Sequence, residues 1–190
     1  MRWARILLCS AVVLMLNVPV PSGAQQAGIV KDATLLGYEI GKDSFGKLLE
    51  ELGEPAGDDV LPLVYEINDG KLRFIVQPGC GGLISWARLT AIPADDNAPE
   101  GSAPLKVEMS EEKLRSGLGI CLGDGIEKVT AILGEPSERV ETGQRAELIY
   151  HWRAADRKPG MSPPFKARYL FWNGELREIS LNSNCWGIKP

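Results

Sequence analysis

Apolar residues recur with the spacing of a helix at two places along the chain. The first stripe consists of Phe45, Leu48, Leu49 and Leu52, and the second of Ile126, Val129 and Leu133. Residues three and four apart lie on one side of a helix, so each stripe predicts a short helix with one apolar face. A helix of about ten residues is marginal by itself in water, so each helix is expected to pack on another element.

Each stripe ends in the same four residues, Leu-Gly-Glu-Pro, at 52–55 and again at 133–136. Glycine readily adopts the left-handed conformation that ends a helix, and proline prevents the helix from resuming. The first helix is expected to start at a cap formed by Asp43 or Ser44, and the second at a cap formed by Asp124.

Alternating apolar and polar residues follow each predicted helix. The runs are 63–67, 71–76 and 81–89 after the first helix, and 148–152, 167–172 and 173–181 after the second. Alternation with a period of two is typical of strands that bury one face. A further short helix is expected at Ser110–Ser116, because Ser110 can cap it and two glutamates occupy its first turn.

The order of these features predicts two copies of one unit. The two Leu-Gly-Glu-Pro tetrapeptides lie 81 residues apart, and a Gly-x-x-aliphatic-Gly motif at 37–41 recurs 82 residues later at 119–123. A single-residue insertion reconciles the two spacings. We therefore expect an α+β fold of two tandem repeats, each with one or two short helices packed on one face of an antiparallel sheet of about three to four strands. The repeats are assigned to 25–89 and 108–190, with a linker at 90–107 that is rich in Pro, Ala and Asp.

The repeated skeleton resembles that of a known fold. Gly-x-x-aliphatic-Gly, then Leu-Gly-x-Pro, then Tyr65 or Tyr150 in the following strand is similar to the repeat of the β-lactamase inhibitory protein fold, which is shared with the outer-membrane assembly lipoproteins of the SmpA/OmlA type. The resemblance implies a helical layer on one face of an antiparallel sheet. In inhibitor-like members it also implies an open sheet face that binds a partner protein. The assembly lipoproteins carry one unit and a lipidated cysteine, and this chain differs from them on both points.

The last strand of the second repeat indicates which side of the sheet faces inward. Ile179 and Leu181 alternate with polar residues and are expected inside, and the repeat places Ala87 and Leu89 with them. The open face is then expected to carry several aliphatic residues, including Ile84, and these partner-binding residues: Trp86, Arg88, Arg73, Trp172, Arg168 and Arg153. Tryptophan and arginine are enriched at binding hot spots. A shift of one residue in register would invert this assignment, and the linker or the other repeat could instead cover the tryptophans.

The first residues have the features of a secretory signal peptide. Arg2 and Arg5 precede an apolar run from Ile6 to Leu16, and small residues occupy 22–24. Residues 1–24 are therefore expected to be removed on export, which predicts a periplasmic or secreted protein of the bacterial envelope. The apolar run is too short for an ordinary membrane-spanning helix, and no second run approaches that length, so stable membrane insertion after cleavage is not expected.

Charge narrows the class of partner. The formal net charge is −4, and it becomes −6 without Arg2 and Arg5. An acidic chain with no Lys/Arg cluster argues against nucleic acid, because that binding depends on neutralising phosphates. Another envelope or secreted protein is the expected partner.

Three cysteines follow the predicted signal peptide: Cys80, Cys121 and Cys185. In an oxidising compartment an odd count indicates one disulfide and one remaining thiol. Cys121 and Cys185 belong to the same repeat and are the favoured pair, and Cys80–Cys185 is the alternative. Cys80 lies among glycines at the expected tip of a hairpin, where an exposed thiol could also act as a nucleophile.

No other group of residues indicates catalysis, metal binding or cofactor binding. The single histidine, His151, and the cysteine spacing give no metal signature, and no cofactor motif is present. We expect an exported, non-catalytic, inhibitor-like module that binds a protein through its open sheet face. The alternatives are an assembly or scaffold factor of the envelope, and an enzyme of unrecognised type that uses Cys80.

Overall fold

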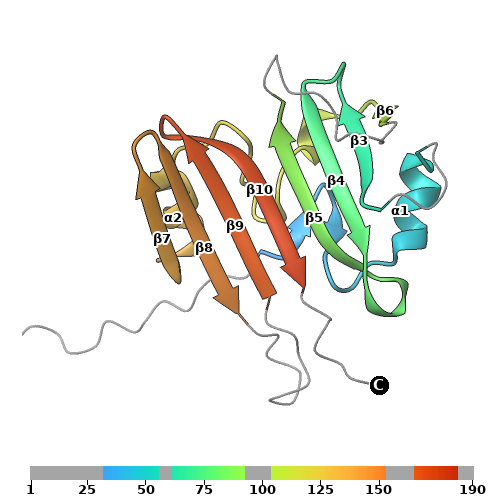
Figure 1. The fold of residues 1–190 in the computed structure, drawn as a ribbon, viewed down its shortest axis with the longest axis horizontal. Helices are drawn as coiled ribbons and strands as arrows, with labels where there is room; N and C mark the ends of the chain where they lie inside the picture. The colour runs from blue at the N-terminus through green and yellow to red at the C-terminus, as the bar shows by residue number, and fades with distance from the viewer. Residues whose placement is uncertain (1–31, 56–60, 93–103, 153–164, 184–190) are drawn as a thin grey trace, which may run out of the picture.

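An eight-stranded sheet forms the centre of the computed structural model (Figure 1). The structure describes residues 32–55, 61–92, 104–152 and 165–183. The strands run in the order β6-β3-β4-β5-β10-β9-β8-β7, and all neighbours are antiparallel except β3 and β6. The strands of the first half are β3 (Leu63–Ile67), β4 (Leu72–Pro78), β5 (Ile84–Ala91) and β6 (Leu105–Val107). Those of the second half are β7 (Glu138–Thr142), β8 (Arg145–Trp152), β9 (Phe165–Trp172) and β10 (Glu175–Ser183).

Helices and a hairpin share one core with one face of this sheet. The helices are α1 (Phe45–Leu52) and α2 (Ile126–Leu133), and the hairpin consists of β1 (Thr34–Leu35) and β2 (Tyr38–Glu39). In Figure 1, α2 and the hairpin lie behind the sheet, and α1 lies beside β3. Leu48 of α1 and Val129 of α2 are fully buried in the same core as the inward side chains of the strands. The fold is therefore α+β, as expected.

The two halves of the chain meet in the middle of the sheet, where β5 pairs with β10. Ala87 lies opposite Leu181, and Leu89 lies opposite Ile179. The first half supplies β6-β3-β4-β5 and the second supplies β10-β9-β8-β7, so one continuous sheet contains strands from both. The four side chains at this junction are fully buried, which joins the two halves through one core.

Both helices end at a glycine with a positive φ, a backbone conformation that glycine adopts more readily than other residues. Gly53 has φ 83° and ψ 168°, and Gly134 has φ 82° and ψ −167°. The Gly53 N–H donates to the Leu49 carbonyl at 2.9 Å, and the Gly134 N–H donates to the Thr130 carbonyl at 2.8 Å. A side chain is strained at such φ values, so the predicted glycine helix ends are confirmed, although ψ lies in the extended range and not in that of the left-handed conformation expected.

A buried tyrosine ties each helix end to the sheet. The Tyr65 hydroxyl donates to the Gly53 carbonyl at 2.8 Å, and the Tyr150 hydroxyl donates to the Gly134 carbonyl at 3.1 Å. Burial raises the pKa of both tyrosines to about 12. A third tyrosine, Tyr169, is fully buried with its ring edge-on to Tyr150, and its hydroxyl has no hydrogen-bond partner among the described residues.

These three tyrosines are expected to respond differently to loss of the hydroxyl. Tyr65→Phe and Tyr150→Phe should each lower the free energy of unfolding by about 1 kcal/mol, because each removes one hydrogen bond to a helix-end carbonyl. Tyr169→Phe should leave it unchanged or raise it by up to about 1 kcal/mol, because a buried hydroxyl without a partner is costly. Urea unfolding of the three variants measures the difference. A loss for Tyr169→Phe as large as the other two would show that its hydroxyl has a partner.

The two helices start differently. The Ser44 hydroxyl accepts from the Lys47 N–H at 3.1 Å, which is one of the two caps expected for α1. The expectation that Asp124 caps α2 is wrong, because Gly125 occupies the cap position and makes no side-chain bond. The Asp124 carboxylate instead accepts from the Cys121 N–H at 2.8 Å, so it closes the turn that precedes the helix.

Three short segments also differ from expectation. The end of the expected linker forms β6, which pairs with β3. The strand β7 was not predicted, because its sequence is charged and its residues are all exposed. Only a 3-10 turn, η2 (Glu111–Lys113), forms where a helix was expected at Ser110–Ser116. The Ser110 side chain makes no cap bond, and Leu114 leaves the helical region at φ −78° and ψ 49°. Segments this short depend on their neighbours more than on their own sequence.

The inward face of the sheet agrees with the alternation of the strands, with one exception. The core contains these expected inward residues: Tyr65, Phe74, Val76, Ala87, Leu89, Tyr150, Tyr169, Phe171, Ile179 and Leu181. Ile84 was expected on the open face, but it is fully buried in this core. Trp86 lies opposite Gln77 whereas Ile84 lies opposite Pro78, so Ser85 is an extra residue in β5. This bulge reverses the alternation and turns Ile84 inward.

Candidate partner-binding face

The sheet face that points away from the helices, here called the outer face, differs between its two ends. On β3 and β4 its side chains Val64, Arg73 and Ile75 are at most 4% exposed. On β7 and β9, Val140 and Trp172 are 50% and 49% exposed. The accessible part of the outer face therefore lies toward the second half of the chain.

The sequence predicts six partner-binding residues: Trp86, Arg88, Arg73, Trp172, Arg168 and Arg153. Trp172 is well exposed, and the Arg88 and Arg168 side chains are 33% and 32% exposed. Trp86 is half-buried, and Arg73 is buried, so Arg73 offers almost no contact surface. Arg153 lies outside the described residues. The structure thus brings Trp86, Arg88 and Arg168 together on β5 and β9, the two strands that flank β10.

An ionic cluster occupies the centre of the outer face. The Glu178 carboxylate on β10 accepts from Arg168 Nη2 on β9, and its other oxygen lies 3.8 Å from Arg88 Nη1 on β5. Arg88 and Arg168 both lie opposite Ser180, so they approach Glu178 from either side. The Glu178 side chain is 10% exposed, whereas both arginines are about three times as accessible. These three residues are named the arginine–glutamate cluster.

A second bulge places Glu178 in this cluster. The register of β10 shifts between Leu176 and Glu178, which makes Arg177 the extra residue. Leu176 and Ile179 both point into the core, at a spacing of three instead of two. Glu178 therefore lies on the outer face, where strict alternation from Leu176 would have pointed it into the core.

Trp86 supports the cluster from β5. Its indole Nε1–H donates to the Ser180 hydroxyl at 3.1 Å, which fixes the ring against β10. The Arg88 guanidinium lies 5.5 Å from the centre of that ring, within range of a cation–π interaction. The Arg88 Nε is buried without a hydrogen-bond partner among the described residues. Arg88 is thus held in place by packing, and part of its donor capacity is unused.

A shallow hollow adjoins the exposed end of the outer face. It has a volume of about 450 Å³ and is lined by Val140, Thr142, Arg145, Glu147 and Trp172. Arg145 donates to Glu147 on one side of it, and Val140 and Trp172 supply its apolar surface. Sequence reasoning missed Val140 because β7 was not predicted as a strand. The β-branched residues Val140 and Thr142, which alternate with the charged Arg139 and Glu141, are the signal that could have found it.

The two residues considered for chemistry, His151 and Cys80, are not part of the arginine–glutamate cluster. His151, at the exposed end of β8, has its Nε2 3.3 Å from the Glu138 carboxylate. Within the described ranges, no group of three His, Cys, Asp or Glu residues is arranged to hold a metal ion. Cys80 is exposed in the 3-10 turn η1 (Cys80–Gly82).

The expected disulfide and signal peptide involve residues that the structure does not describe. The Cys121 thiol forms no disulfide with another described residue and donates to the Gly119 carbonyl at 3.7 Å. Cys185 lies outside the described residues, so the Cys121–Cys185 pair and its Cys80–Cys185 alternative stay predictions.

Residues 1–24, the expected signal peptide, also lie outside the described residues. In the part of the chain that is described, no helix is long and apolar enough to span a membrane.

Comparisons with known proteins give only distant similarities. No family model and no curated protein matches the sequence. Among solved structures, the chain is similar to a DUF4309 family protein (YjgB) from Bacillus subtilis, with 16% identity, coverage of 78% of this chain and 83% of that one, and a TM-score of 0.43. It is also similar to a "putative beta-lactamase inhibitor protein" from Streptococcus mutans, with 16% identity, coverage of 80% and 90%, and a TM-score of 0.24. At these values neither similarity assigns a function.

Proposed function

We propose that this protein is an exported, non-catalytic module that binds an acidic surface of another envelope or secreted protein on its outer face. The observation that carries the proposal is the arginine–glutamate cluster on a sheet face that the helices leave uncovered. Trp172 and Val140 provide exposed apolar surface on the same face. Arginine and tryptophan supply a large share of the binding energy at protein interfaces.

Charge complementarity supports an acidic partner. Arg88, Lys166 and Arg168 lie near one another on the outer face, and Glu178 is the buried counter-ion among them. This basic centre is local, because the whole chain has a formal net charge of −4. A carboxylate of the partner could accept paired hydrogen bonds from the outward N–H groups of the two guanidinium groups. Because Glu178 and Trp86 already hold these groups, little side-chain freedom is lost on binding.

The proposal includes the origin of the sheet in two copies of one unit, as in the inhibitor-like arrangement. Equivalent contacts in the two halves support it. The Gly41 N–H donates to the Ile84 carbonyl at 2.7 Å, and the Gly123 N–H donates to the Leu176 carbonyl at 2.8 Å. Each contact joins the glycine motif before a helix to the junction strand of the same half, β5 or β10, and the tyrosine bonds at the two helix ends add a second matched pair.

The binding proposal is tested by affinity capture followed by measurements on the captured protein. The purified protein is used as bait for an envelope extract, and the partner is then titrated calorimetrically. Arg168→Ala and Trp172→Ala are each expected to weaken its affinity at least about tenfold, or about 1.4 kcal/mol. Affinity should also fall as salt is added, because the contact between charged groups is screened.

Arg139→Ala is the matched control, because it removes an exposed arginine of β7 that is not in the cluster. It should leave the affinity unchanged. Failure to capture a stoichiometric partner, or equal affinity of that partner for Arg168→Ala and Arg139→Ala, would reject the outer face as the binding surface.

A further inference from the structure

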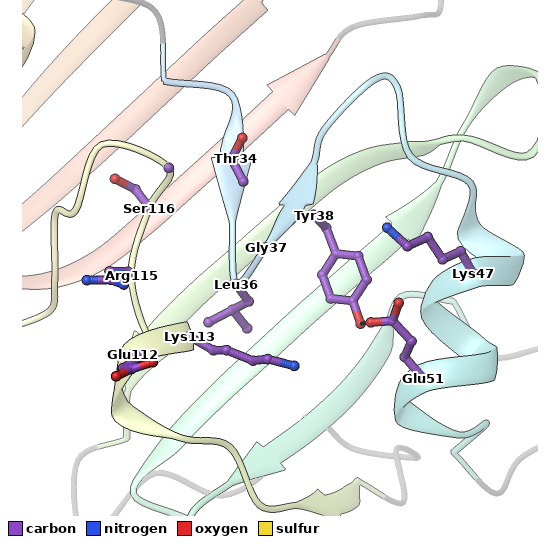
Figure 2. Close-up of a pocket in the computed structure, with 11 residues that line it drawn as sticks. Thr34, Leu36, Gly37, Tyr38, Lys47, Glu51, Glu112, Lys113, Arg115 and Ser116 are labelled. Atoms are coloured by element: carbon purple, nitrogen blue, oxygen red, sulfur yellow. Dashed lines mark hydrogen bonds between the residues drawn. The ribbon is translucent and has the colours of Figure 1, made fainter.

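A second concave region lies on the helix side of the sheet, between α1, the β1–β2 hairpin and the segment 107–117 (Figure 2). It consists of two adjoining hollows of about 380 and 450 Å³ that share Leu36, Tyr38, Glu51 and Lys113. We call it the helix-side groove. Its volume is in the range of sites that bind small molecules.

Hydrogen bonds fix the segment 107–117, which forms one wall of this groove. The Asn68 side-chain amide donates to the Met109 carbonyl at 3.0 Å and accepts from the Met109 N–H at 2.9 Å. The Leu36 N–H donates to the Arg115 carbonyl at 3.1 Å, which joins the hairpin to the opposite wall. The groove is therefore formed without a ligand, and binding requires little ordering of the protein.

The groove combines an apolar floor with balanced charges. Leu36 and Tyr38 are 3% exposed at its floor, and Leu52, Val107 and Met109 are partly buried against the core beside them. Its charged residues are Lys47, Lys113, Arg115, Glu51, Glu108 and Glu112. Because basic and acidic groups are equal in number, the groove favours a ligand that carries both charges over a simple anion or cation.

Two of these charges face each other across the first hollow. The Tyr38 hydroxyl donates to Glu51 Oε2 at 2.8 Å, and Figure 2 shows the Lys113 side chain extending from the opposite wall toward α1. No ion pair joins Glu51 or Lys113 to any other described residue. An ammonium on one wall and a carboxylate on the other thus line the same hollow over an apolar floor.

We propose that the helix-side groove binds a short apolar peptide with free ends, of the size of a dipeptide. Its carboxylate contacts Lys113, its ammonium contacts Glu51, and its side chains lie on Leu36, Leu52 and Met109. This binding is independent of the outer face, because the groove contains none of the residues of the arginine–glutamate cluster.

The test uses L-leucyl-L-leucine as the probe and amide chemical shifts of the isotope-labelled protein as the readout. Saturable shifts are expected in the hairpin, α1 and 107–117. The N-acetylated and C-amidated dipeptides should each bind at least about tenfold more weakly, because each lacks one charge-assisted contact. Lys113→Gln should weaken the free dipeptide similarly and should bind the amidated one no worse than the wild type does. Glu51→Gln should do the same for the acetylated dipeptide.

Lys106→Gln and Glu50→Gln serve as matched controls, because both residues are exposed and line neither hollow. They should bind the free dipeptide as the wild type does. The absence of saturable shifts up to the solubility limit, shifts confined to other surfaces, or equal affinity of the wild type for free and capped dipeptides would each overturn the proposal. The capped dipeptides test it on the wild type even if a variant fails to fold.

Discussion

Phe171→Ala is expected to lower the free energy of unfolding by about 3–5 kcal/mol, whereas Trp172→Ala should lower it by less than about 1 kcal/mol. The two aromatic residues are neighbours in β9 but lie on opposite faces of the sheet. Phe171 is fully buried in the core, and Trp172 is 49% exposed. Removing Phe171 leaves a cavity among packed side chains, whereas about half of the Trp172 side chain is already in water and its removal leaves no enclosed cavity. Urea or thermal unfolding of both variants measures the difference.

Trp152→Ala provides the comparison at the end of the neighbouring strand. Its ring stacks on Phe165 with centroids 4.5 Å apart, and it packs against the core. It should therefore destabilise the fold more than Trp172→Ala does. If Trp172→Ala unfolded the protein as readily as Phe171→Ala, the two faces of β9 would be wrongly assigned, and the outer face would lose its main apolar contact.

Glu178→Gln is expected to lower the free energy of unfolding by about 2–3 kcal/mol, because it removes the only carboxylate contacting Arg88 and Arg168 in the described cluster. The substitution keeps the size of the side chain, so the effect reports charge and hydrogen bonding more than packing. Both arginines are about one-third exposed, and partial solvation limits the loss. Chemical unfolding at low salt is the appropriate measurement.

Glu175→Gln is the matched control on the same strand. Glu175 pairs with Arg177 at 2.7 Å, but their side chains are 57% and 50% exposed. Exposed ion pairs contribute about 0–1 kcal/mol, so this variant should be close to wild type. If Glu175→Gln and Glu178→Gln lowered the free energy of unfolding equally, the arginine–glutamate cluster would contribute no more to stability than an exposed ion pair.

Local patterns predicted the features that depend on one segment of chain. The apolar stripes and the glycines after them located α1 and α2, because a helix face and a helix end are both specified within a few residues. Alternation located the buried side of β4, β9 and most of β10, because one face must be apolar. The same alternation placed Arg88, Arg168 and Trp86 on the outer face together.

Interruptions of these patterns were not predicted. The bulge at Ser85 turned Ile84 inward, and the bulge at Arg177 allowed Leu176 and Glu178 to face opposite sides. A bulge relieves a mismatch between paired strands, so it depends on the partner strand as well as on the bulged one. Alternation also gave the side of the sheet for Arg73 but not its burial, which depends on what surrounds the side chain.

The sequence by itself determined the helices, their glycine ends and the inward side of the central strands, because the spacing of apolar, glycine and proline residues acts over a few residues along the chain. Only the tertiary structure decided that β5 pairs with β10, that Glu178 gathers Arg88 and Arg168, and that Glu51 and Lys113 face each other across a groove. These arrangements join residues from different elements of the chain. The distances between them are set by packing and strand register, which no local sequence pattern specifies.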